Sequence, residues 1–189
     1  MDIFSHGLWV AAAYKGTNDF VLKPKSKKPL KIWRAAFWGV FPDFFSFIIP
    51  FIWIFGGLVL GKFRFSDLPS PETLEPLISP KLNGVLEFSK SLYNLSHSFV
   101  IFLAVFAILY LIFRRPLWEL GGWFIHVLID IPSHSYQFFP TPFLWPVSSF
   151  KFNGFNWSNK WFMAVNFSFL ALVWGFFLFK KLGNKSKIS

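Results

Sequence analysis

Apolar residues along this 189-residue chain gather into four long blocks. The blocks cover residues 35–60, 99–113, 117–131 and 161–179. A helix that crosses the hydrocarbon core of a bilayer needs about 20 predominantly apolar residues. The pattern therefore predicts an all-α, multi-pass integral membrane protein with three to four membrane-inserted helices, in which 99–113 and 161–179 are spans. The block 117–131 is short for a span, and we expect its polar end to open into a water-filled depression.

The first block leaves two topologies open. If 35–60 crosses the membrane fully, Asp43 and His97 enter from opposite faces. If 44–60 is a re-entrant or half-inserted hairpin, as the helix-breaking Pro50 permits, both residues lie on one face. We favour the hairpin because the polar residues of the other blocks would then share one site with Asp43.

The first fourteen residues predict a short amphipathic helix. Their apolar residues make one face at helical spacing. At about 1.5 Å per residue, the helix is too short for a core of about 30 Å. Asp2 stands where a signal peptide carries a basic residue. We therefore expect an uncleaved helix at the membrane interface that carries His6.

Two hydrophilic segments separate the blocks. Residues 62–95 predict a surface loop followed by an amphipathic helix near 82–95, and residues 133–160 form a long loop rich in aromatic residues and proline. Long loops are often functional. We expect this one to fold over the end of 117–131 and bury Trp145, although its aromatics could instead lie among lipid headgroups. The chain is interpreted as a single domain with a basic tail at 180–189.

Composition supports the membrane interpretation. The chain is 54% hydrophobic and 23% aromatic, and its 15% charged residues compare with about 25% in a typical soluble domain. The net charge is +10, and the basic residues that produce it cluster beside the apolar blocks. Positive charge at such positions orients spans and attracts anionic lipid. We therefore expect membrane lipids as partners, an inner or plasma membrane location and no nucleic-acid binding. The absence of cysteine excludes thiolate metal ligands.

Histidine and aspartate side chains are concentrated in or beside the apolar blocks. His126 and Asp130 are spaced i, i+4 and share a helix face. Such groups are costly in an apolar helix unless they pair, bind a metal or line a wet cavity. Pro132 is expected to break the helix before His134, which would leave His134 on the loop surface. The predicted ligands of a divalent metal, zinc or alternatively manganese or iron, are His6, Asp43, His97, His126 and Asp130.

Each of these residues also has a purely structural interpretation. His6 could be an interfacial histidine, Asp43 could cap a helix that begins at residue 44, and His97 could cap the 99–113 helix. His126 and Asp130 could form a structural hydrogen bond. Because a structural account needs a separate reason for each residue, their joint occurrence favours one site.

The motifs occur in an order that resembles the YdjM-like family of inner-membrane metal-dependent hydrolases. The residues that carry the resemblance are His6, Pro42-Asp43, Ser96-His97-Ser98, Gly122 with His126 and Asp130, and Leu144-Trp145-Pro146. It extends from residue 1 to about 160 and implies a multi-pass helical protein, a metal site and hydrolase activity. The family carries a His-Arg pair shortly before Ser96, where this chain reads Leu92-Tyr93-Asn94-Leu95. That difference removes a ligand and an anchor for phosphate or carboxylate.

The resulting hypothesis is a membrane-embedded metal-dependent hydrolase that uses a metal-activated water on an amphiphilic ester or phosphoester. The resemblance and the residue types assign catalysis to Asp43, His97 and Asp130. The alternatives are a non-enzymatic metal-binding scaffold, a partner-binding protein or a small ion- or proton-coupled transporter, which the small number of spans disfavours. A Ser–His pair at Ser96 and His97 is disfavoured because adjacent residues seldom reach each other as nucleophile and base.

Overall fold

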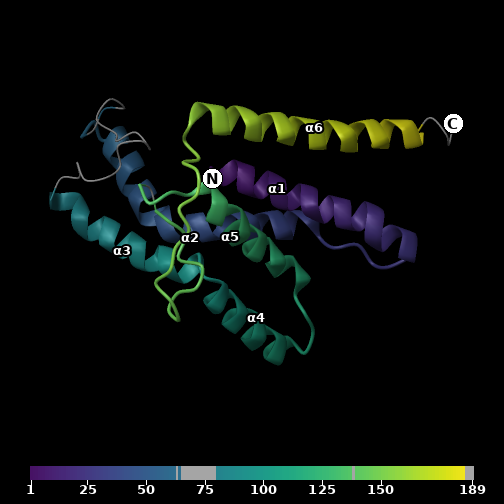
Figure 1. Ribbon diagram of the computed structural model, residues 1–189, viewed down its shortest axis with the longest axis horizontal. Helices are drawn as coiled ribbons and strands as arrows, with labels where there is room; N and C mark the ends of the chain where they lie inside the picture. Colours follow the sequence, from purple (N-terminus) through teal and green to yellow (C-terminus); the bar gives the residue numbers. More distant parts are fainter. Residues whose placement is uncertain (63, 65–79, 138, 186–189) are drawn as a thin grey trace.

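The computed structural model of the protein describes residues 1–62, 64, 80–137 and 139–185, and within them every regular element is a helix (Figure 1). The prediction of an all-α protein is therefore confirmed. The longer elements are α1 (Ile3–Gly16), α2 (Ile32–Val59), α3 (Pro80–Ser96), α4 (Phe99–Phe113), α5 (Gly121–Ser133) and α6 (Lys160–Lys185). A π-helical turn (Thr17–Leu22) and two 3₁₀ turns (Lys23–Lys25 and Trp118–Leu120) complete the set.

Two of these helices, α2 and α6, are long and apolar enough to cross a membrane. A third span exists if the end of α3 and the whole of α4 count as one broken span, since the two segments meet at 59°. With 15 residues, α4 is about 22 Å long, and α5 with 13 residues is shorter still. The described residues therefore support two or three spans, and the fourth predicted span is not found among them.

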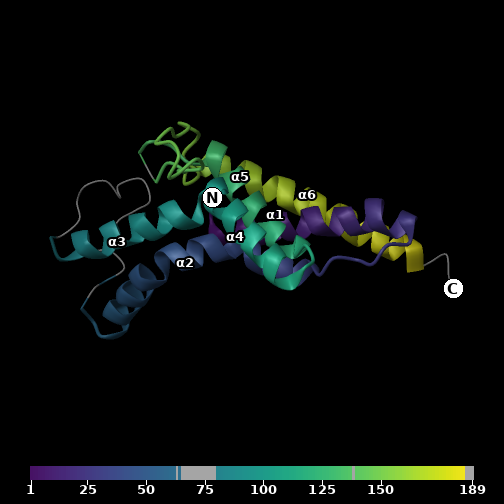
Figure 2. The same ribbon diagram turned by 90° about the horizontal axis from the view of Figure 1, so that it is seen from below.

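The predicted hairpin within the first block is wrong. Helix α2 runs from Ile32 to Val59 without reversing direction, although Pro42 and Pro50 lie inside it (Figures 1 and 2). Asp43 thus lies near the middle of a continuous helix. His97 nevertheless lies close to Asp43, because α3 packs along α2 and the break between α3 and α4 lies beside the middle of α2.

Helix α1 packs into the protein between α2 and α6 (Figure 1). Asn166, a buried polar residue of α6, joins this helix to α1. Its side chain donates to Ser5 Oγ at 2.7 Å and accepts from Trp9 Nε1 at 2.8 Å. Side-chain hydrogen bonds of this kind hold helices together where water is excluded. The N-terminal end of α1 lies beside the C-terminal end of α5 (Figure 1).

Helices α2 and α5 approach each other closely where both carry glycine. A Cβ atom added at Gly122 in α5 would overlap the carbonyl group of Ala35 in α2 and would lie 3.0 Å from the backbone nitrogen of Gly39. Small residues at helix interfaces in membranes permit this approach. The crossing brings the backbone of α2 within reach of the side chains of α5.

The loop after α5 folds back over the end of that helix, as expected. The backbone N–H groups of Gly154 and Phe155 donate to His134 O and Pro132 O, both at 2.8 Å. Trp145 is partly buried, so the prediction that the loop buries it is met in part. It contacts the region of the site through its carbonyl oxygen, which accepts a hydrogen bond from Ser98 Oγ.

The helix predicted at 82–95 is confirmed by α3. Most of the surface loop predicted before it, residues 63 and 65–79, lies outside the described residues, and so does Phe138 of the aromatic loop.

The apolar faces of α2 and α6 remain exposed, with side chains such as Trp33, Ile52, Phe55, Trp161, Leu172 and Phe179. Exposed apolar patches of this extent are typical of surfaces that contact lipid.

We expect Gly122→Ala to lower the free energy of unfolding by about 1–3 kcal/mol, because the methyl group overpacks the contact with Ala35. Denaturant titration in detergent would measure the change. Gly175→Ala is the matched control: it lies in the middle of α6, and no described atom lies within 4 Å of its added Cβ. That substitution should leave stability unchanged or raise it through helix propensity. Equal effects of the two substitutions would contradict the close approach.

Candidate metal centre

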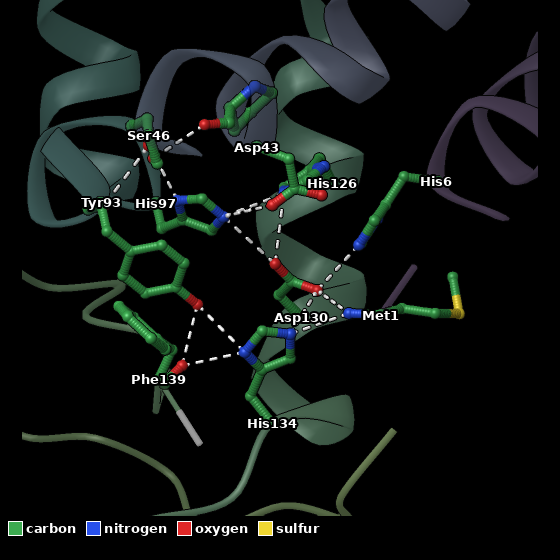
Figure 3. A network of polar contacts seen from close by, with 12 residues as sticks. Met1, His6, Asp43, Ser46, Tyr93, His97, His126, Asp130, His134 and Phe139 are labelled. Carbon is green, nitrogen blue, oxygen red and sulfur yellow. Dashed lines mark hydrogen bonds and ion pairs between the residues drawn. The ribbon is translucent and has the colours of Figure 1, made fainter. Parts of the chain in front are cut away.

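Four donor groups meet where α2, α5 and the α3–α4 break come together (Figure 3). Asp43 comes from α2, His97 from the break, and His126 and Asp130 from one face of α5. One ligand atom from each lies within 4.8 Å of the other three. All four side chains are buried, and Asp43 is the most accessible at 5%.

The distances between these atoms match the edges of a tetrahedral metal site. His97 Nε2 lies 3.0 Å from His126 Nε2, and the two nitrogens lie 3.3 and 3.2 Å from Asp130 Oδ2. Asp43 Oδ1 lies 3.5 Å from His97 Nε2 and 3.7 Å from His126 Nε2. Donors about 2.0–2.2 Å from a zinc ion are about 3.3–3.6 Å apart in a regular tetrahedron. The four groups are therefore spaced as ligands of one ion.

The tautomer of His126 follows from its second nitrogen. His126 Nδ1 lies 2.6 Å from the carbonyl oxygen of Gly39 in α2. Because a carbonyl oxygen only accepts hydrogen bonds, Nδ1 carries the proton. In the neutral ring, Nε2 then presents a lone pair to the other donors.

The tautomer of His97 follows from a chain of hydroxyl groups. Ser46 Oγ donates to the carbonyl of Pro42 at 2.8 Å, which uses its only proton. Ser96 Oγ therefore donates to Ser46 Oγ at 2.7 Å and must accept from His97 Nδ1 at 2.8 Å. A further acceptor near Ser96 Oγ, the carbonyl of Tyr93, is more distant at 3.5 Å. In the neutral ring, His97 thus also presents an Nε2 lone pair to the site.

This arrangement is suited to a cation. The Nε2 atoms of His97 and His126 lie 3.0 Å apart, and the carboxylate oxygens offered by Asp43 and Asp130 lie within 4.8 Å. Two negative charges at that distance repel by roughly 3–4 kcal/mol at an effective dielectric constant of about 20. A divalent cation among them would satisfy both lone pairs and neutralise both carboxylates. The residues present therefore fit a metal ion, and oxygen and nitrogen donors suit zinc, manganese or iron.

Aromatic stacking holds the two histidine rings in this orientation. The ring of His6 stacks on His126 with centroids 3.8 Å apart, and the ring of Tyr93 stacks on His97 at 3.7 Å. Hydrogen bonds to the Nδ1 atoms and contacts with the ring faces therefore both restrict rotation. Contacts that non-ligating residues make with the ligand side chains orient the ligands and tune metal affinity.

His6 lies in the protein interior, next to the four-donor group but outside it. Its side chain is fully buried, which excludes the exposed interfacial interpretation. His6 Nε2 lies 2.9 Å from Asp130 Oδ1, the carboxylate oxygen opposite the one that faces His97 and His126. The structure thus brings all five predicted residues together. His97 and His126 face one carboxylate oxygen of Asp130, and His6 faces the other.

The expectation that His134 lies on the loop surface is wrong. Its side chain is 5% exposed, and Nε2 lies 3.4 Å from Asp130 Oδ1. Pro132 does not break the helix before this point because it occupies the last turn of α5, where the His134 N–H still donates to Asp130 O at 3.1 Å. His134 consequently stays one turn beyond Asp130 on the same face.

The capping interpretations are also wrong. Asp43 lies inside α2 and does not begin a helix. The cap of α4 is Ser98, whose Oγ accepts from the N–H groups of Val100 and Ile101, so His97 is left for the site. Ser96 does reach His97, contrary to expectation, but it accepts the imidazole proton and is 1% exposed. Its hydroxyl is therefore a support for the ring and not a nucleophile.

Two supporting residues were missed in the sequence. Ser46 lies one turn after Pro42 in α2, and that i, i+4 spacing was the available signal. Tyr93 carries no charge or metal-binding group that marks it in the sequence, yet its hydroxyl donates to Phe139 O at 2.9 Å and lies 3.1 Å from His134 Nδ1. Neither partner could be identified without the packing of α2 on α3.

Comparison with known proteins finds no match: no family model, no curated protein and no solved structure corresponds to this chain. The geometry of the donor groups is accordingly the main basis for a functional interpretation. It establishes a buried group of histidine and aspartate side chains that could hold a metal ion.

We expect His97→Ala, His126→Ala, Asp43→Ala and Asp130→Ala each to lower bound metal at least tenfold, because each removes one vertex of the tetrahedron. Elemental analysis of detergent-purified protein would measure the metal content. Gly175→Ala, remote from the group in α6, serves as the control. Full occupancy in all four variants would contradict the metal site.

Ser96→Ala should weaken zinc binding about 10–100-fold, because it removes the acceptor that fixes the tautomer of His97. Competition with a chromophoric chelator would give the affinity. Ser91→Ala is a matched control, since Ser91 lies on the same helix with an exposed hydroxyl bonded only to Glu87 O. An unchanged affinity in Ser96→Ala would show that the hydroxyl chain does not orient the ligand.

Proposed function

We propose that the protein is a membrane-embedded, metal-dependent hydrolase that acts on an amphiphilic ester or phosphoester. The observation that supports this proposal is the pair of Nε2 lone pairs, on His97 and His126, that face two carboxylates at the spacing of a metal site. Histidine and carboxylate donors without thiolate are the set found in hydrolytic zinc centres. A metal ion held there would lower the pKa of a water molecule toward 7.

The residues of the group have different roles in the proposed reaction. Three of them are held rigidly by the Gly39 carbonyl, the hydroxyl groups of Ser46 and Ser96, and the neighbouring rings. These are His97, His126 and Asp130. Asp43 is less constrained, since its Oδ2 has no hydrogen-bond partner among the described residues. That oxygen is thus available to accept a proton from an attacking water. Asp43 is also the most exposed of the four, and we expect a substrate to approach the group on its side.

The substrate class follows from the surroundings of the site. The helices that carry the donors expose broad apolar surfaces, and the aromatic loop after α5 lies over the same end of the site. A reactant that reaches Asp43 from lipid would need an apolar body and a polar ester group. Lipids and lipid-linked esters meet that description, and the basic residues beside the apolar segments would favour anionic headgroups.

A metal-binding scaffold is the second candidate, and one observation favours it. Four protein donors close a tetrahedron, whereas a catalytic zinc site usually keeps one position for water. The hydrolase proposal therefore requires that Asp43 leave the ion, or that the ion accept a fifth ligand, during turnover. The two candidates differ in turnover and agree in metal content.

The deciding measurement is hydrolysis by purified protein in vesicles of phosphatidylglycerol and phosphatidylethanolamine. We expect lipid cleavage that disappears after treatment with a chelator and returns on addition of zinc, manganese or iron. Asp43→Asn should lower kcat at least a hundredfold, because it removes the proposed base. His126→Ala should be inactive and metal-depleted. Stoichiometric metal without cleavage of any ester or phosphoester would favour the scaffold, and ion-coupled uptake into vesicles would favour transport.

A further inference from the structure

Asp130 presents its two carboxylate oxygens to two different sets of groups (Figure 3). Oδ2 faces His97 and His126 of the four-donor group. Oδ1 faces away from them, toward His6 at 2.9 Å and His134 at 3.4 Å. The distance to His134 lies in the range expected between neighbouring ligands of one metal ion, and the distance to His6 is shorter.

The tautomer of His134 matches that of His97 and His126. His134 Nδ1 lies 2.9 Å from the carbonyl oxygen of Phe139, which only accepts, so Nδ1 carries the proton. The Nε2 lone pair of His134 is therefore directed toward Asp130 Oδ1.

His6 completes the second set. Its side chain is fully buried, and neither ring nitrogen has a hydrogen-bond partner among the described residues. The short approach of Nε2 to Asp130 Oδ1 lacks hydrogen-bond geometry. A buried polar atom without a partner is unfavourable unless something else binds it.

A positive group already lies at this position. The α-amino nitrogen of Met1 lies 2.8 Å from Asp130 Oδ1 and 2.8 Å from His134 Nε2. The carboxylate oxygen and the imidazole lone pair thus hold a cation between them. A divalent ion would take over that role and would in addition satisfy His6.

We propose that a second divalent cation binds between His6, His134 and Asp130 Oδ1, so that the Asp130 carboxylate bridges two metal ions. The inference rests on the proposed function only in that the first ion is the one bound by Asp43, His97, His126 and Asp130. Paired ions about 3.5–4 Å apart are common in enzymes that cleave phosphoesters, where they stabilise the attacking and leaving oxygens.

The test is metal stoichiometry and spin coupling in the full-length protein loaded with Mn²⁺ in detergent. We expect two ions per chain in the wild type, with an exchange-coupled electron paramagnetic resonance spectrum. His134→Ala and His6→Gln should each hold one ion and give the six-line spectrum of isolated Mn²⁺. Circular dichroism and gel filtration identify any variant that fails to fold, and the other variant then decides.

The outcomes separate the two proposals. One ion in the wild type, unchanged in both variants, would overturn the second site and leave the proposed function standing. Two ions in folded His134→Ala and His6→Gln, or the loss of both ions from both, would equally overturn it. A wild type that binds no ion would overturn the second site and the metal-dependent hydrolase together.

Discussion

The direction of a few buried hydrogen bonds governs the chemistry of this protein. The carbonyl groups of Gly39 and Pro42, both in α2, are acceptors only. One binds His126 directly, and the other sets the direction of the chain through Ser46 and Ser96 to His97. In the neutral state, each ring is therefore protonated on the nitrogen that faces the protein and carries a lone pair on the nitrogen that faces the carboxylates. A site that could hold a cation follows from this arrangement.

The same constraint explains why α2 has to remain continuous. If the chain reversed after residue 44, Gly39 and Ser46 would not lie along one helix face, and the carbonyl supports would be lost. Pro42 is compatible with the helix because neighbouring helices and serine side chains can satisfy the backbone groups that proline frees. The glycine contact between α2 and α5 then brings the Gly39 carbonyl within 2.6 Å of His126 Nδ1.

Placing charged and imidazole groups inside apolar helices costs free energy, and contacts among these groups offset that cost. The polar side chains of α1, α2 and α5 contact one another, while the outer faces of α2 and α6 stay apolar. The cluster is thus compatible with a membrane environment because most of its polar groups have a partner within the bundle or are directed at a position suited to a metal ion. Asn166 follows the same rule, as the buried amide of α6 bonded to α1.

Periodicity and residue type determined much of this protein by themselves. They predicted the helical class, the bounds of α4 to the residue, the shared face of His126 and Asp130, and the gathering of His6, Asp43 and His97 around them. These features depend on local spacing or on the cost of burying polar groups. Only the tertiary structure decided the continuity of α2, the burial of His134 and the roles of Ser46 and Tyr93. The reason is physical: a proline can break a helix or be accommodated within it, and a serine acquires a function only when packing brings an acceptor and a donor to its hydroxyl.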